Sequence, residues 1–229
     1  MKRQNSLVRG CLGVASAAIM ALAVVGCDTT PAKQEGTSLA PATKPTTPAV
    51  VAVATKPGTA VVAPTPAKFT AIRMKAGTDA EFKDSKGVVW AADSGFEGGS
   101  TIDRAGQITI TGVTPPYTPE LYMAEHYQMD SWSAKVPNGS YVVKLHFSED
   151  YDGITDATGR VFTYAVKDGT ASGKTIKEVK DFSPWKASGA QYKAYVDSIP
   201  VTVTAGQITV TFTPQTENPQ INAIEVLPG

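Results

Sequence analysis

Two short segments carry side chains suited to a polyhydroxylated ligand. Tyr151 follows an apolar run and stands among acidic residues, whereas Glu217 and Asn218 place a carboxylate acceptor beside an amide donor. The acidic neighbours of the tyrosine are Glu149, Asp150, Asp152 and Asp156. Sugar rings stack their apolar faces on aromatic planes, and their hydroxyl groups need acceptors and donors together. These segments therefore predict a sugar-binding site, the alternative being that Tyr151 packs its own loop and the acids form a solvated surface.

The same acidic residues allow a calcium site as an alternative. Carboxylates clustered in a loop are the ligands that hard cations prefer, and Asp150, Asp152 and Asp156 form such a cluster. Their spacing differs from the EF-hand loop, because the glycine is at Gly153 and no bidentate glutamate follows at the required distance. The calcium alternative is therefore weaker than sugar binding, and we expect no metal or cofactor.

Catalytic chemistry has little support in the sequence. A glycosidase needs two carboxylates across a sugar cleft, and Glu149 with Glu217 is a pair that any acidic β domain offers. The two histidines are His126 and His146, and the second lies within an apolar run where a structural role is expected. No glycine-rich phosphate loop precedes a helix. We expect a non-catalytic protein.

The pattern of the domain is that of β-strands separated by turns. Runs rich in β-branched and aromatic residues are expected to be strands. They cover residues 108–111, 141–147, 161–166, 199–204, 208–213 and 221–227. No segment of ten or more residues has helical periodicity, and the phrases at 106–111 and 206–211 are expected to be two similar turn-to-strand entries. The expected fold is all-β, an antiparallel β-sandwich of the jelly-roll or galactose-binding-like type.

The N-terminus has the organisation of an export signal. Lys2, Arg3 and Arg9 precede an apolar run at 12–25, which is short for a bilayer span. The run ends at Cys27 after small residues, and this resembles the lipobox of bacterial lipoproteins. The expected arrangement is a signal peptide over 1–26 and a lipid-anchored Cys27, which places the protein in the bacterial cell envelope. An ordinary signal peptide with a chance cysteine is the alternative, and the choice of inner or outer membrane stays open.

A linker separates this anchor from the domain. Residues 27–68 are rich in Pro, Thr and Ala, and all eighteen aromatic residues lie from Phe69 onward. Such composition favours an extended spacer without a core. The domain at 69–229 has 14 Lys and Arg against 19 Asp and Glu, so its net charge is −5. This charge argues against nucleic acid as a partner, and membrane contact is expected through the lipid anchor.

Six segments of the domain together resemble the malectin domain. In chain order they are residues 72–77, 89–99, 121–127, 136–149, 159–162 and 217–227. The resemblance covers nearly all of 69–227, and its specificity comes from six motifs in the right order. It implies a jelly-roll-like β-sandwich that binds carbohydrate, including glucose-containing oligo- or polysaccharide, through aromatic and polar residues on its loops.

The resemblance also implies particular site residues. Tyr127 and Tyr151 correspond to sugar-contacting tyrosines, and Glu217 stands where the sugar-binding member has aspartate. Phe96 is the nearest candidate for a further aromatic ligand after Trp90. Two residues depart from the family pattern, because Asp152 replaces an aromatic residue and His126 replaces an arginine.

Two hypotheses of different classes follow. The first is a carbohydrate-binding lipoprotein whose ligand contacts Tyr127, Tyr151, Asp152, Glu217, Asn218 and Phe96. The second is a structural or protein-interaction lipoprotein that keeps the sandwich without the sugar site and has cell-envelope protein partners. An exposed aromatic surface beside Tyr151 and Glu217 would favour the first.

Overall fold

The computed structural model describes residues 69–229, which form twelve strands and two short helical segments. The first four strands are β1 (Ile72–Lys75), β2 (Phe82–Lys83), β3 (Val89–Trp90) and β4 (Phe96–Asp103). The 3₁₀ segment η1 (Pro119–Tyr122) leads into β5 (Ala124–Lys135), β6 (Gly139–Phe147), β7 (Val161–Asp168) and β8 (Lys174–Phe182). The helix α1 (Pro184–Ser188) precedes β9 (Tyr195–Val203), β10 (Gln207–Thr216), β11 (Gln220–Ile221) and β12 (Ala223–Pro228).

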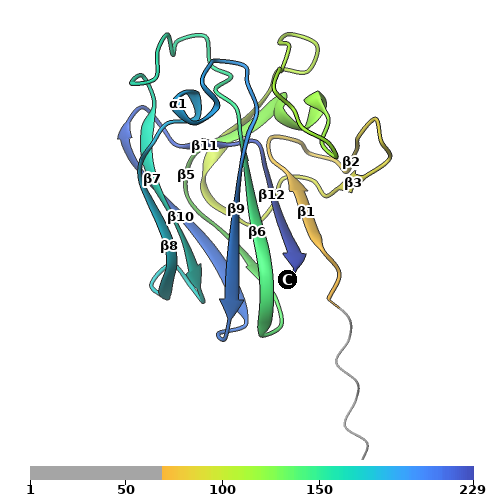
Figure 1. The fold of residues 1–229 in the computed structure, drawn as a ribbon, viewed down its shortest axis with the longest axis vertical. Coiled ribbons are helices and arrows are strands. Elements are labelled where there is room, and N and C mark those ends of the chain that lie inside the picture. Colours follow the sequence, from red (N-terminus) through yellow and green to blue (C-terminus); the bar gives the residue numbers. More distant parts are fainter. Residues whose placement is uncertain (1–68) are drawn as a thin grey trace, which may run out of the picture. The chain divides into compact units, whose positions relative to one another are not determined.

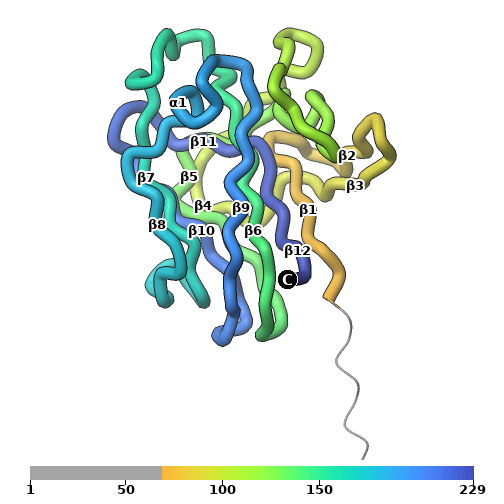
Figure 2. Tube along the Cα trace, in the orientation of Figure 1, coloured from red at the N-terminus to blue at the C-terminus, as the bar shows by residue number. Residues whose placement is uncertain are grey.

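The main strands form two antiparallel sheets that face each other. One sheet has the order β1-β12-β6-β9, and the other has β11-β5-β10-β7-β8 with β4 paired to β5. Figures 1 and 2 show β9, β6, β12 and β1 side by side, with β7, β8 and β10 in the other layer. Side chains from both sheets share one core, so the architecture is the predicted antiparallel β-sandwich.

Aromatic side chains dominate the middle of this core. Phe147 on β6 is fully buried, and its ring lies 4.7 Å from that of Phe182 on β8 and 5.7 Å from that of Tyr164 on β7. Phe162 lies 5.3 Å from Phe182 in an edge-on arrangement. Contacts of this geometry stabilise a core beyond the area that they bury. The cluster therefore joins the two sheets.

A smaller cluster includes Trp90 of β3, and one of the two histidines packs against it. Trp90, Leu121 and Tyr122 are buried there. His146 is also buried, with its Nδ1 3.0 Å from the Tyr122 hydroxyl and its Nε2 3.1 Å from Glu225 Oε1. Burial lowers the pKa of His146 although Glu225 opposes the shift. The expected structural role of this histidine is confirmed.

Two strand prolines lie where the strand has a neighbour on one side only. Pro200 is on β9, which is an edge strand of its sheet. Pro214 is on β10 beyond Thr211, the last residue of that strand that pairs with β5. Edge positions of this kind tolerate proline, because the side that faces no strand needs no N–H.

Most predicted strands are confirmed, and one is wrong. The runs at 141–147, 161–166, 199–204 and 208–213 coincide with β6, β7, β9 and β10, and the run at 221–227 coincides with β11 and β12 in succession. Residues 108–111 form no strand beyond one isolated bridge between Thr111 and Lys193. Gly106 and Gly112 flank them with positive φ, and Ile110 packs into the smaller cluster. Only the second of the two similar phrases, at 206–211, is therefore a turn-to-strand entry.

The longest strand, β5, was not predicted. Its sequence mixes polar and apolar residues without long apolar runs, and Gln128 interrupts the alternation with φ 63°. The predictions for the signal peptide, Cys27 and the linker fall outside the described residues. Within 69–229, no helix is long and apolar enough to cross a membrane.

Replacing Phe147 by alanine is expected to destabilise the domain by about 3–5 kcal/mol, because it leaves a cavity in the aromatic cluster that joins the sheets. Urea denaturation followed by tryptophan fluorescence measures the change in the free energy of unfolding. Val89→Ala, at a side chain 46% exposed, is the control and should change it by less than about 0.5 kcal/mol. A cost for Phe147→Ala below about 1 kcal/mol would contradict the central place given to this ring.

Candidate functional site

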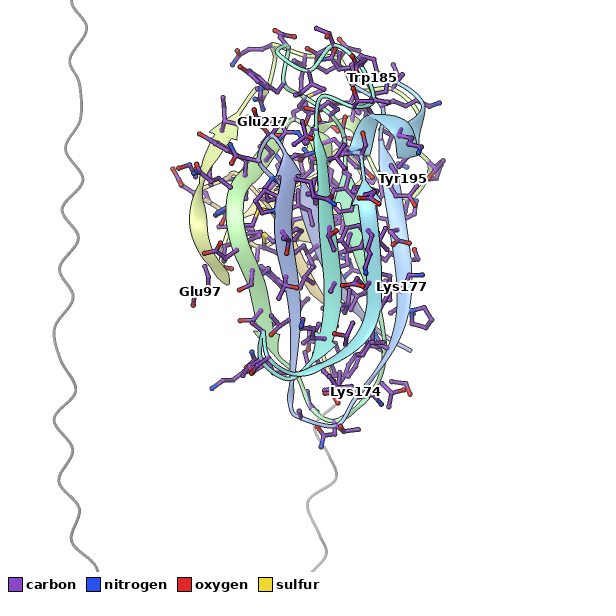
Figure 3. The ribbon with its side chains drawn as sticks, turned by 90° about the vertical axis from the view of Figure 1, so that its left-hand side faces the viewer. Glu97, Lys174, Lys177, Trp185, Tyr195 and Glu217 are labelled. Atoms are coloured by element: carbon purple, nitrogen blue, oxygen red, sulfur yellow. The ribbon has the colours of Figure 1, made fainter. Side chains whose placement is uncertain are left out.

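A cavity of about 300 Å³ opens among four loops and strand ends of the sandwich. Seven side chains line it: Ile102, Arg104, Glu125, Tyr127, Tyr151, Arg160 and Glu217. They come from β4 and the segment after it, from β5, from the long β6–β7 loop and from the β10–β11 loop. Figure 3 shows Glu217 toward one end of the six-stranded sheet, and Glu97 of β4 toward the opposite end. The cavity therefore gathers residues that lie far apart in the sequence.

The β6–β7 loop holds Tyr151 at the cavity with its ring accessible. The side chain is 47% exposed. Its backbone O accepts hydrogen bonds from Gln191 Nε2 at 2.9 Å and from the Ile154 N–H at 3.0 Å. The ring lies against Gly153, where a Cβ atom would come within 2.5–2.8 Å of it. The glycine at this place thus allows the ring to lie flat along its own loop.

Strand β5 supplies Glu125 and Tyr127 from one face. Alternate residues of a strand point to the same side, so both reach the cavity. Glu125 is opposite Ile102 of β4, which also lines the cavity. Just beyond Tyr127 the strand bends at Gln128, whose N–H donates to the Pro219 carbonyl at 2.9 Å. This bond fastens the β10–β11 loop to the strand that carries the tyrosine.

Glu217 occupies the tip of the β10–β11 loop in a left-handed conformation. Its φ is 58°, a value that non-glycine residues rarely adopt. Glu217 Oε1 accepts hydrogen bonds from the Asn218 N–H at 3.1 Å and from Asn218 Nδ2 at 2.9 Å. The carboxylate is exposed, and its two hydrogen bonds from Asn218 hold its orientation. The loop therefore presents an acceptor at the mouth of the cavity.

A buried ion pair joins the two loops that carry Tyr151 and Glu217. Arg160 Nε donates to Glu149 Oε2 at 2.7 Å and Nη2 donates to Glu149 Oε1 at 3.3 Å. Its remaining terminal nitrogen donates to the Asn218 carbonyl. Burial raises the pKa of Glu149 although the arginine opposes the shift. Both oxygens of this carboxylate are engaged, so Glu149 is unsuited to acid–base work on a ligand.

Buried polar groups adjoin the cavity, and one of them, Glu125, also lines it. Glu125 is 2% exposed, and its Oε1 accepts a hydrogen bond from Arg104 Nη1 at 2.9 Å. Asp150 Oδ2 accepts from Asn222 Nδ2 at 2.8 Å. The other oxygens, Glu125 Oε2 and Asp150 Oδ1, are buried without a hydrogen-bond partner. Burial, and next the charge of Glu125, raise the pKa of Asp150 well above its usual range.

The structure brings three of the predicted site residues together and leaves three outside. Tyr127, Tyr151 and Glu217 line one cavity. Asn218 contributes its carbonyl to Arg160 and its amide to Glu217. Asp152 accepts a hydrogen bond from the Tyr192 hydroxyl and is not among the lining residues.

Phe96 does not reach the cavity. It is opposite Trp132 in the β4–β5 pairing, and its ring stacks on His126 at 4.0 Å. His126 Nδ1 lies 3.0 Å from Asp93 Oδ2, and its Nε2 lies 3.0 Å from the Gly98 carbonyl. Burial opposes the charged imidazole, but the Asp93 and Gly98 contacts outweigh it and raise the pKa of His126. Both residues therefore support the β4–β5 edge.

Four lining residues were not identified from the sequence. Glu125 stands two residues before Tyr127, and Arg160 lies within the segment 159–162 that carries the family resemblance. These two had a signal in the motifs, although their roles were not assigned. Ile102 and Arg104 had none, because their place depends on how β4 aligns with β5.

The carboxylates of the calcium alternative are engaged separately. Asp150 is buried against Asn222, Asp152 is bonded by Tyr192, and Asp156 accepts from the Thr158 N–H and hydroxyl within its own turn. Within residues 69–229, no group of three or more His, Cys, Asp or Glu side chains is placed to hold a metal ion.

The sandwich and its loop cavity define a β-sandwich ligand-binding domain. A family model described as the malectin domain matches residues 70–224, and the chain belongs to this family. The comparison with curated proteins found no match. Membership supports a binding role.

Solved structures of low identity share the fold. The Bacteroides uniformis β-glucuronidase matches at TM-score 0.57 and 17% identity over 70% of this chain. The ANXUR2 extracellular domain from Arabidopsis thaliana matches at 0.56 and 17% over 68%. A complex of the plant peptide RALF23 with FER and LLG2 matches at 0.55 and 16% over 68%. The chain spans 18% of the glucuronidase and 47% of each of the two plant chains.

Replacing Asp150 by asparagine is expected to change the pH dependence of stability. In the wild type the aspartate ionises more easily unfolded than folded, so the free energy of unfolding falls as pH rises above about 4. Asparagine cannot ionise and keeps an acceptor for Asn222. The variant should therefore gain stability relative to wild type between pH 4 and pH 7, as measured by urea denaturation at several pH values. A difference that is constant or shrinks with pH would contradict burial of the neutral acid.

Proposed function

We propose that the domain is a non-catalytic carbohydrate-binding module whose cavity holds a sugar residue of an oligo- or polysaccharide. The observation that carries the proposal is the convergence of Tyr127, Tyr151 and Glu217, from three distant segments, on one cavity. Each of the three is also a sugar contact that the sequence predicts.

The chemistry of the lining suits a neutral sugar ring. Tyr151 offers an exposed aromatic face for stacking, and Tyr127 is half-buried on β5. Glu217 accepts hydrogen bonds from hydroxyl groups, and Arg104 donates from the side of the guanidinium not used by Glu125. Since Arg160 and Arg104 are each paired with a glutamate, the cavity presents polar groups without a strong excess charge.

The carboxylates favour binding over glycoside hydrolysis. A glycosidase requires one acid and one base or nucleophile, each free to act on the scissile bond. Glu149 is bonded to Arg160 through both oxygens, and Glu125 is buried with one oxygen bonded to Arg104. Glu217 alone remains accessible among the glutamates of the site.

A second candidate is a protein-interaction module. The comparison with the complex of a plant peptide with FER and LLG2 favours it, because a chain of this fold occurs there beside a peptide. Under this alternative the same loops contact a cell-envelope protein, and the tyrosines serve as contact residues instead of stacking on sugar.

We further propose that the chain is a lipoprotein of the bacterial cell envelope, anchored through Cys27. The support is the charged N-terminus, the short apolar run and the small residues before this cysteine. Mass spectrometry of the protein purified from bacterial membranes should find a mature N-terminus at a lipid-modified Cys27. The Cys27→Ser variant should lose both the modification and the membrane fraction. Recovery of unmodified Cys27 in a soluble mature chain would contradict the anchor.

A glycan-array screen with the full-length protein tests the carbohydrate proposal. Binding to a defined glycan class is expected, and Tyr151→Ala and Glu217→Ala should each weaken it by about tenfold or more, because each removes a central contact. Trp185→Ala and Glu97→Ala, labelled in Figure 3 and outside the cavity lining, are the matched controls and should bind as wild type. Circular dichroism and the melting temperature establish that the variants fold. Absence of binding to any glycan by the folded protein would favour the protein-interaction module.

A further inference from the structure

A second and larger cleft lies beside the first cavity. It has a volume of about 560 Å³. Ile102 and Arg104 line the first cavity, whereas Asp103 and Ala105 line this cleft. Residues 102–105, at and just after the end of β4, therefore line the first cavity and this cleft in alternation. The walls of the cleft also include residues of the β1–β2 loop and of η1.

The cleft contains a lysine whose side chain is largely buried. Lys75 is the last residue of β1 and is only 3% exposed. Its Nζ lies 4.4 Å from the centre of the Phe82 ring, which covers the side chain. In the described part of the chain, Nζ makes no hydrogen bond and has no carboxylate oxygen within 4.0 Å. Nζ itself keeps some contact with solvent at the cleft, so it is available to donate to a ligand there.

The backbone holds this lysine in place. Lys75 is paired with Ala223 of β12, and its N–H donates to the Ala91 carbonyl at 3.0 Å. The chain then turns at Gly77, whose φ is 77° and where a Cβ would lie 2.7 Å from the Glu125 backbone nitrogen. The turn is thus packed closely on β5. The amine therefore belongs to a well-supported strand end and not to a loose loop.

Carboxylates surround the lysine without pairing to it. Glu120 has its Oε2 buried without a hydrogen-bond partner, and Asp79, Glu81 and Asp103 complete the acidic lining. Burial lowers the pKa of Lys75, and Asp103 and Glu120 oppose the shift from a distance. The cleft therefore offers one donor and four carboxylates, of which Asp103 already accepts a hydrogen bond from the Ala105 N–H at 2.8 Å through one oxygen.

This combination selects the chemistry of a ligand. A simple anion would meet four carboxylates, and a simple cation would meet the buried ammonium. A hydroxyl group accepts a hydrogen bond from an amine and donates one to a carboxylate, so neighbouring hydroxyls on one ring satisfy both kinds of group. The glycine and alanine residues of the walls leave room for such a ring.

We propose that this cleft is a second carbohydrate-binding site, in which a sugar residue accepts a hydrogen bond from Lys75 and donates to Glu120 and Asp103. The site goes beyond the cavity of Tyr127 and Tyr151 and does not depend on it. Two sites on one domain raise the effective concentration of a second sugar once the first is bound. An oligosaccharide that reaches both should therefore bind more tightly than either monosaccharide.

Nuclear magnetic resonance of the ¹⁵N-labelled full-length protein reads the two sites separately. The probes are the methyl glycosides of glucose, galactose and mannose, together with cellotetraose. Amide shifts of Gly77, Thr78 and Gly106 report on the cleft, and those of Tyr151 and Gly153 report on the first cavity. At least one probe is expected to shift the cleft amides in the wild type and in Tyr151→Ala alike.

Variants at the cleft provide the decisive comparison. Lys75→Met keeps the apolar stem and removes the charge, and it should weaken binding at the cleft by about tenfold or more. Glu120→Gln should weaken it by a smaller factor, and Lys83→Met, at an exposed lysine of β2, is the control that should bind as wild type. The spectra themselves establish that each variant folds.

Two results would overturn the second site. One is a set of shifts confined to the first cavity for every probe, which leaves the carbohydrate proposal intact and removes the cleft. The other is cleft shifts that persist unchanged in Lys75→Met, which shows that the lysine amine does not bind the ligand. Shifts confined to the cleft would instead contradict the first cavity and keep the second.

Discussion

The buried ion pair between Arg160 and Glu149 is the interaction on which the cavity depends. One guanidinium group joins the start of the β6–β7 loop to the carbonyl of Asn218 in the β10–β11 loop. Tyr151 lies two residues after Glu149, and Glu217 lies one residue before Asn218. A buried pair of this kind adds little net stability, yet removing one partner leaves a charge in the interior and costs several kcal/mol. The ion pair therefore holds the β6–β7 and β10–β11 loops at a fixed distance from each other.

Asn222 joins several segments of the chain next to these loops. Its Oδ1 accepts from the Ser148 N–H at 2.7 Å, and its Nδ2 lies within hydrogen-bonding distance of the carbonyls of Tyr122 and Ala124 and of Asp150 Oδ2. One buried amide thus ties the end of β6 to η1, the start of β5 and the long loop. Buried polar groups are costly unless satisfied, and a satisfied network specifies a single arrangement. The protein accepts polar groups behind the cavity because they orient its walls.

The sequence predicted the strands whose buried faces are strongly apolar and missed those whose faces are mixed. β6, β7, β9 and β10 carry dense β-branched and aromatic runs, whereas β4 and β5 do not. The same distinction limits the site. Tyr151 and Glu217 were predicted from side-chain chemistry and, together with Tyr127, from the malectin resemblance. Phe96, the candidate for a further aromatic ligand, lies outside the cavity, and Ile102 lines it instead. The two lie six residues apart on β4, about 20 Å along a strand, and only the pairing with β5 shows which one reaches the cavity.

The two hollows differ in how their charges are balanced, and this difference bears on how the domain would hold a ligand. In the first cavity each arginine is already paired with a glutamate, so a neutral ring gains contacts without breaking an ion pair. In the second cleft Glu120 Oε2 is buried without a partner among residues 69–229, so this oxygen bears a desolvation cost that a ligand hydroxyl group would relieve. Stacking would therefore dominate in one site and hydrogen bonding in the other. Because β4 delivers alternate residues to both, a shift of β4 against β5 would disturb the two sites together, and the His126 contacts with Asp93 and Gly98 hold that register.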